Sequence, residues 1–348
     1  MTTRVLVFNS TTTRAEPQPY GLEALEPLGY DLVLPPRAPL PRKVRDVVHH
    51  RWGFQVDQLG LRASRRADLT LAYLEPNIAY PAMLRHATPR MRRTPLVGIF
   101  CWAAEELLTA DDVRRRRLRR MLSACDVVGF FSRNQRDVFV SHGVAEDKLA
   151  VLPFGIDTSQ FPVSAAGEER DIPVLSVGWD RGRDYDTLAR AVDGSGIGVT
   201  VVAPRERFAD LSAPAELDVL GTVPHAEYRA LLTRAQVVVV PTHELAYPTG
   251  QTVAMEAAAA GCAVVVTRTE AMEDYFTDGV TAAMPPVADA PALRARIEGL
   301  LGDPTRRSEL VTRSLEHAHQ HFDHARLWQA LDGELRSRNL APARGAGR

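Results

Sequence analysis

The segment from Thr249 to Glu256 contains a glycine, several polar side chains and one carboxylate. Gly250, Gln251 and Thr252 precede an alanine-rich run of strong helix formers, so we expect a helix to begin there. The first N–H groups of a helix have no internal partner and lie at the positive end of its dipole. This position favours a phosphate, and the glycine allows it to approach closely.

Glu256 lies on the same predicted helix, roughly 7.5 Å along the axis from Gln251. Helical side chains lean toward the N-terminus, so its carboxylate could reach back toward a group attached to the phosphate. A carboxylate repels phosphate but accepts hydrogen bonds from a diol, such as that of a ribose. The alternative is that Glu256 is a solvated helix residue and the run Ala257 to Ala260 simply packs.

A second loop, Gly178 to Arg183, carries two arginines directly after an apolar run. The planar guanidinium groups of Arg181 and Arg183 have several N–H donors that match phosphate oxygens. Together with the helix start at Gly250 they would form a two-sided diphosphate clamp. The alternative is that both are surface arginines. The glycine fingerprints of dinucleotide-binding and P-loop proteins do not occur.

Other charged clusters have ordinary explanations. The basic run Arg114 to Arg120 could touch an anionic membrane surface, although nearby acidic residues favour a solvated helix face. The histidines from His317 to His324 have helical spacing, but no carboxylate or cysteine set completes a metal site, so we expect none. His243 and Glu244 either contact a ligand or serve the turn before Gly250.

The framework for these loops is an alternation of apolar strand-like runs and helices. Between Val237 and Val266 the order is strand, loop, helix, strand, which is typical of a right-handed parallel βαβ unit. Loops at the carboxyl ends of such strands face the ligand crevice. The same alternation runs through both halves of the chain, so we predict an α/β protein of two Rossmann-like, doubly wound domains with parallel sheets facing a central cleft.

Composition narrows the class of protein further. The length of 348 residues suggests two domains. A net charge of −1 provides no positive electrostatic field to attract nucleic acid, so no nucleic-acid partner is expected. The three cysteines show no metal or disulfide spacing, and no apolar run or leader points to a membrane or to export. We therefore expect a cytoplasmic protein.

Several motifs taken together resemble the second domain of retaining glycosyltransferases of the GT-B architecture, family 4. They follow the same order and spacing over about 151–322, whereas the first domain matches only in its βα pattern. The motifs are VLPFGIDTSQF (151–161), LSVGWDRGRDYDTLARA (175–191), VLGTVPHAEYRALLTRAQVVVVPT (219–242), GQTVAMEAAAAGCAVVVT (250–267), YFTDGVTAAMPPVADAPAL (275–293) and LLGDP (300–304).

The resemblance implies roles for single residues. Arg183 falls where the family has a diphosphate-binding lysine, and Trp179 replaces the usual arginine, so Arg181 would take over that role. Glu256 matches the ribose-binding glutamate of a pair spaced eight positions apart, whereas Pro248 replaces the sugar-contacting one.

In place of that glutamate, the resemblance implies that Thr249, Gly250, Gln251 and Thr252 contact sugar and phosphate. It also implies that Val223 reads the base through its backbone.

The resemblance implies retaining, metal-independent transfer of a sugar from a nucleoside-diphosphate donor to a small-molecule or glycan acceptor, with no cofactor. Alternatives are a nucleotide-sugar epimerase of the same architecture and a non-catalytic nucleotide-sugar binding protein. The implied domains are an acceptor domain (1–162), a donor domain (163–322), a C-terminal helix that could cross back to the first domain (323–340) and a disordered tail (341–348).

Overall fold

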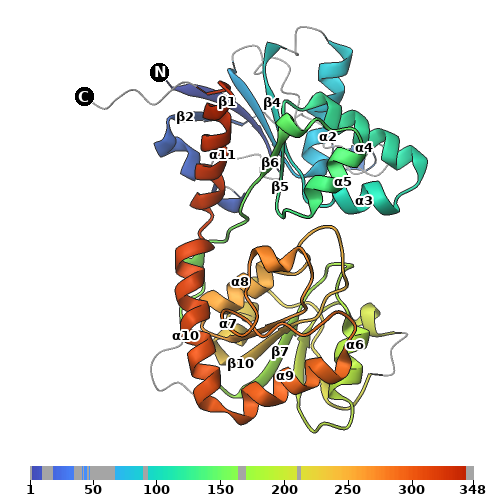
Figure 1. Ribbon diagram of the computed structural model, residues 1–348, viewed down its shortest axis with the longest axis vertical. Helices are drawn as coiled ribbons and strands as arrows, with labels where there is room; N and C mark the ends of the chain where they lie inside the picture. The colour runs from blue at the N-terminus through green and yellow to red at the C-terminus, as the bar shows by residue number, and fades with distance from the viewer. Residues whose placement is uncertain are drawn as a thin grey trace. The chain divides into compact units, whose positions relative to one another are not determined.

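The computed structural model divides into two compact units (Figure 1). The first combines Met1–Phe154 with His324–Arg348, and the second is Gly155–Asp323. The residues that the structure describes are 2–9, 19–34, 41, 43–44, 47, 67–88, 93–163, 170–209 and 213–341. The tail predicted from residue 341 therefore lies outside the described residues, apart from Ala341.

The first boundary lies after Phe154, earlier than the sequence suggested, for a physical reason. The Ile156 N–H donates to the carbonyl of Phe322 at 2.7 Å, so the two chain segments that connect the units pair with each other inside the second unit. Helix α11 (Ala325–Ser337) then packs in the first unit against the 3-10 helix η1 (Pro19–Leu28). There the Trp328 indole N–H donates to the Tyr20 carbonyl at 2.7 Å.

The first unit has a six-stranded parallel sheet in the order β2-β1-β3-β4-β5-β6. Strand β1 has β2 on one side and β3 on the other, so the direction of winding reverses between β1 and β3. The strands are β1 (Thr3–Phe8), β2 (Tyr30–Val33), β3 (Leu69–Tyr73), β4 (Leu96–Ile99), β5 (Val127–Phe130) and β6 (Leu149–Val151). The helices between them are α2 (Glu75–Ala87), α3 (Ala103–Thr109), α4 (Asp112–Ala124), α5 (Gln135–Ser141) and the short η4 (Glu146–Lys148).

The second unit has a five-stranded parallel sheet in the order β11-β10-β7-β8-β9. Here the winding reverses between β7 and β10. The strands are β7 (Ile172–Val177), β8 (Val199–Val202), β9 (Leu217–Val219), β10 (Ala235–Val240) and β11 (Ala263–Val266). The helices are α6 (Tyr185–Val192), α7 (His225–Arg234), α8 (Gln251–Ala259), α9 (Ala290–Gly302) and α10 (Pro304–His321), with short η5 (Thr158–Gln160), η6 (Arg205–Phe208) and η7 (Met272–Asp274).

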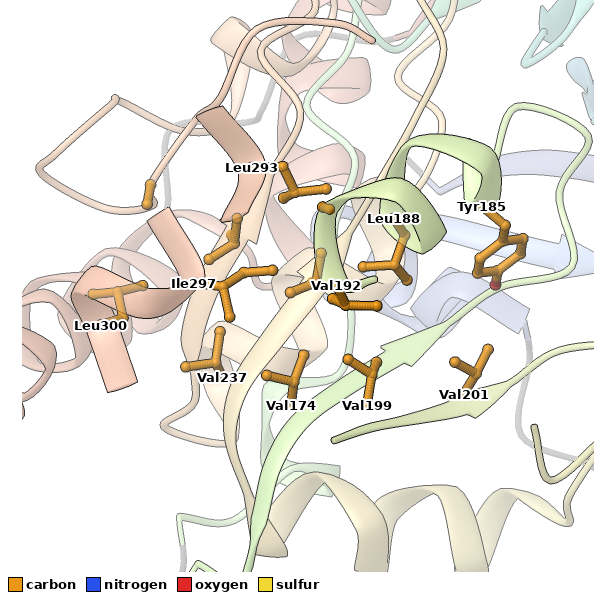
Figure 2. Close-up of a cluster of buried hydrophobic side chains, with 14 of the residues drawn as sticks. Val174, Tyr185, Leu188, Val192, Val199, Val201, Val237, Leu293, Ile297 and Leu300 are labelled. Atoms are coloured by element: carbon orange, nitrogen blue, oxygen red, sulfur yellow. The ribbon is translucent and has the colours of Figure 1, made fainter. Parts of the chain in front are cut away.

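The core of the second unit fixes the ends of its strands. β-Branched side chains of the sheet pack against one face each of α6 and α9, as Figure 2 shows. Each fully buried aliphatic side chain of this kind contributes about 1.5–3 kcal/mol relative to exposure. The cluster includes Val174, Val199, Val201, Val237, Leu188, Val192, Leu293, Ile297 and Leu300. The α/β prediction with parallel sheets is confirmed in both units, and the loops that follow β7 and β10 begin from rigid strands.

Candidate functional site

The two loops singled out by the sequence meet where the second sheet reverses its winding. Strands β7 and β10 are direct neighbours, and their carboxyl ends lie side by side. The Asp184 N–H donates to the Pro241 carbonyl at 3.0 Å, and the His243 N–H donates to the Gly182 carbonyl at 2.9 Å. Ligands of open α/β sheets bind at such a reversal point. The structure therefore brings Arg183 and Gly250 together.

Arg183 is buried between two glycines. Its side chain is 6% exposed, and a Cβ on Gly178 or on Gly250 would overlap the guanidinium. Its Nε and Nη1 are buried without a hydrogen-bond partner. Burial lowers the pKa of Arg183, whereas Tyr185 and Asp180 act in the opposite direction. A buried cation with unfilled donors is unfavourable by itself, and an anion would supply what it lacks.

The predicted helix start is confirmed. Gly250 is the N-cap of α8 with φ of 82°, in the left-handed region that glycine adopts without strain. Its carbonyl accepts the N–H of Ala254 at 3.1 Å. Gln251 is 6% exposed, and its Oε1 is buried without a partner, while Thr252 is half-buried. The first turn of α8 therefore adds polar groups beside Arg183.

Glu256 is tied to a neighbouring helix. The Tyr228 hydroxyl of α7 donates to Glu256 Oε2 at 2.5 Å. Desolvation raises the pKa of Glu256 to about 7, while the Tyr228 hydrogen bond and the Arg183 charge oppose that rise. Burial, together with Glu256, raises the pKa of Tyr228 well above its usual value. Glu256 is thus partly buried and held by a hydrogen bond, so it is not a freely solvated helix residue, while Ala257 to Ala260 are packed as the alternative supposed. Its ribose-binding role stays a prediction.

Asp180 organises the two loops and was missed by the sequence analysis. Its Oδ1 accepts the Gly182 N–H at 2.7 Å, the Tyr247 hydroxyl at 2.8 Å and the Thr249 hydroxyl at 2.7 Å. The hydroxyl proton of Thr249 is therefore already used inside the protein. An aspartate beside glycine in a turn often bonds the backbone two residues on, and this was the available signal. The bonds from Tyr247 and Thr249 required the fold.

Arg181 and Val223 lie in different surroundings from Arg183. Arg181 is exposed and forms a side-chain hydrogen bond with Tyr247. Burial raises the pKa of Tyr247, and this hydrogen bond acts in the opposite direction. Val223 is half-buried in the loop between β9 and α7, and β8 separates β9 from β7. The ligand-binding roles of both residues stay predictions.

The remaining charged clusters pair locally. In α4, Arg114 contacts Glu106 at 2.7 Å and Arg115 contacts Asp112 at 2.8 Å. Within the ranges that the structure describes, no group of histidines, cysteines or carboxylates is arranged to hold a metal ion. No helix among these residues has both the length and the apolar character that a bilayer requires.

Two neighbours of the site also form internal contacts. His243 lies 3.7 Å from the Asp184 carboxylate, and Glu244 accepts the Glu270 N–H at 3.2 Å. The hydrogen bond from Glu270 supports the alternative in which Glu244 holds the loop conformation.

Two α/β units with parallel sheets define the GT-B class of fold, and solved glycosyltransferase structures share it. Sucrose-phosphate synthase from Thermosynechococcus elongatus superposes with a TM-score of 0.74 at 16% identity, over 98% of this chain and 100% of that one. HepE from Anabaena, solved with UDP and glucose, gives 0.69 at 15% identity, over 96% and 100%. A glycosyltransferase from Rickettsia africae gives 0.60 at 11% identity, over 96% and 98%.

Residues 169–332 match the family described as glycosyl transferase-like. This stretch contains Arg183, Gly250 and Glu256. No curated protein matches the sequence of the chain. At these low identities the solved structures establish the fold alone.

Proposed function

We propose that the protein is a glycosyltransferase whose second unit binds a nucleoside-diphosphate sugar. The observation that carries the proposal is Arg183, a buried guanidinium with unfilled donors, held between two glycines beside the start of α8, which no side chain caps. An anionic diphosphate would complement both. HepE, of similar fold, has been solved with UDP-glucose, so a UDP-sugar is the first donor to test.

Each site residue has a role in this proposal. Arg183 and the N–H groups at the start of α8, with Arg181 from the exposed side, would hold the diphosphate. Glu256 would accept hydrogen bonds from the ribose through the oxygen that Tyr228 does not occupy. Thr249 would act through its backbone, since its hydroxyl proton serves Asp180.

The reaction forms one bond and breaks another at the anomeric carbon. The acceptor hydroxyl oxygen bonds to that carbon on the same face from which the diphosphate leaves, so the configuration is retained. The breaking C–O bond leaves its electron pair on the diphosphate, whose oxygen takes the acceptor proton. Fixed positive groups stabilise the growing negative charge, and the arginines can supply that charge without a metal or a cofactor.

The acceptor in this proposal is a small molecule or a glycan, and the reaction takes place in the cytoplasm. The three cysteines, Cys101, Cys125 and Cys262, form no disulfide bond, which fits a reducing compartment.

The test is UDP-glucose turnover by the full chain and by Arg183→Ala. Loss of one charge-stabilising donor should reduce turnover by about 10² or more. Arg190→Ala is a matched control, because Arg190 is an exposed arginine of α6. Near-normal turnover by Arg183→Ala would remove Arg183 from the site.

The same assay, run with and without candidate acceptors, separates the proposal from its rivals. Sugar transfer that requires an acceptor supports the transferase. UDP release with no acceptor, together with an altered sugar, would indicate an epimerase. UDP-glucose binding without any consumption would indicate a binding protein, a possibility raised by Pro248 in place of a glutamate.

A further inference from the structure

The first unit contains a buried carboxyl group that the donor site does not use. Glu75 begins α2 directly after β3 and is 3% exposed. Its Oε1 accepts three backbone N–H groups at the start of α3, from Cys101 at 3.0 Å, Trp102 at 2.7 Å and Ala103 at 2.8 Å. These bonds fix the orientation of the carboxyl group completely.

The other oxygen of the same group has no partner. Glu75 Oε2 is buried and unbonded, although a buried oxygen of this kind normally has a hydrogen bond. Desolvation raises the pKa of Glu75 to about 7, against the lowering effect of its backbone hydrogen bonds, and the Glu106 charge adds to the rise. No cation is among the groups that shift it. The group is therefore held ready for a hydrogen bond that the chain does not supply.

A second unfilled acceptor lies in the same helical turn. Asn77 is 2% exposed; its amide nitrogen donates to the Tyr73 carbonyl at 2.6 Å, whereas its Oδ1 is buried without a partner. Glu75 Oε2 and Asn77 Oδ1 are therefore two buried oxygens without hydrogen-bond partners, and both lie just after the carboxyl end of β3 in the first unit.

Glu75 lies at the reversal point of its own sheet. Strand β3 is the first strand beyond that point in the first sheet, as β10 is in the second, so Glu75 corresponds to the loop that carries Gly250. Ligands of open α/β sheets bind at this point. In the second unit the reversal point holds a buried cation with unfilled donors, which suits an anion, beside the unfilled Gln251 Oε1. In the first unit it holds unfilled acceptors, which suit the hydroxyl groups of a neutral molecule.

We propose that Glu75 is the ligand-binding carboxyl group of the first unit and that its Oε2 receives a hydroxyl of the acceptor, a neutral polyol or sugar. This rests on the proposed function, because it names the substrate class of the same enzyme. In its ionised form the Glu75 carboxylate would repel a phosphate or carboxylate ligand, whereas a hydroxyl can hydrogen-bond to Oε2 in either form. Glu75 is placed here as a substrate-binding residue and takes no part in the exchange of bonds.

The test uses Glu75→Gln in the full chain. The glutamine oxygen keeps the three bonds to the start of α3, while an amide NH₂ replaces Oε2, so the change reverses hydrogen-bond polarity with little change of shape. Glu105→Gln is the control, since Glu105 is another buried glutamate of the same unit, 8% exposed. The acceptor probes are glycerol, myo-inositol and methyl α-glucoside, with ethanolamine and glycerol 3-phosphate for comparison.

We expect glycosylation of at least one neutral probe, and a rise of about tenfold or more in its KM with Glu75→Gln. UDP affinity and the Tm should stay as in the unaltered protein. An unchanged KM, or glycosylation of only the amine or the phosphate, would overturn the proposal. A lower Tm with unchanged KM would show that Glu75 only supports α3.

A calorimetric titration of the same neutral probes, in the presence of UDP, needs no turnover. Binding to the unaltered protein that Glu75→Gln weakens supports the proposal, and the absence of binding by every neutral probe contradicts it. Failure of the proposed function looks different, because UDP and UDP-glucose would then neither bind nor react.

Discussion

Replacement of Arg183 by methionine should make the ligand-free protein more stable while abolishing donor binding. Methionine keeps a long apolar side chain in the space between Gly178 and Gly250, and it removes the buried charge. The guanidinium Nε and Nη1 are buried without partners, and each such donor costs about 1–3 kcal/mol. Attraction to Asp180 offsets part of that cost.

The net gain should be about 1–3 kcal/mol in the free energy of unfolding of the second unit. A change of 1 kcal/mol shifts the Tm by roughly 2–4 °C in a domain of 150–250 residues, so a rise of several degrees is expected. This follows the general pattern in which a binding site is kept at the expense of stability.

Thermal unfolding with and without UDP measures both effects. UDP at about 100 times its Kd should stabilise the unaltered protein by about 2.7 kcal/mol, and Arg183→Met should show no such increase. Arg190→Met is the control and should change neither value by much. A less stable Arg183→Met that still responds fully to UDP would refute the reasoning, since Arg183 would then be a structural residue.

The remaining predictions concern other residues of the same site. Gly178→Ala places a Cβ on the Arg183 guanidinium and should weaken UDP binding at least tenfold, whereas Gly198→Ala, which meets no atom within 4 Å, should not; equal UDP affinities in calorimetry would contradict the packing argument. Glu256 has a folded-state pKa of about 7, above its ordinary 4.5, so the stability from its neutral form is fully present below pH 4.5 and is lost as pH rises through 7. Ribose hydroxyls form stronger hydrogen bonds to the ionised carboxylate, so UDP affinity should rise from pH 6 to 8 more steeply in the unaltered protein than in Glu256→Gln. The ionisation of UDP itself affects both proteins equally. Parallel pH profiles of UDP affinity would exclude Glu256 from the ribose site.

The sequence predicted the features that depend on local patterns. The β-branched runs and the glycine before the alanine-rich helix located β10, α8 and β11, because strand and helix periodicity and the N-cap are local properties. Parallel pairing followed from the helix between the strands. On the same basis, the placement of Arg183 and Gly250 at neighbouring strand ends was predictable.

The contacts that could not be predicted join residues far apart in the chain. Tyr228 reaches Glu256 from α7, and Asp180 binds Tyr247 and Thr249 from another loop. These bonds depend on side-chain directions that only the packed sheet defines. The different burial of Arg181 and Arg183 likewise depends on which side chain passes between two glycines.

A crystal structure of the full chain with UDP tests the central claim most directly. We expect the diphosphate to lie against the Arg183 guanidinium and the N–H groups that begin α8, with the ribose hydroxyls hydrogen-bonded to Glu256. UDP bound elsewhere, with Arg183 still enclosed between Gly178 and Gly250 and touching no phosphate, would contradict it.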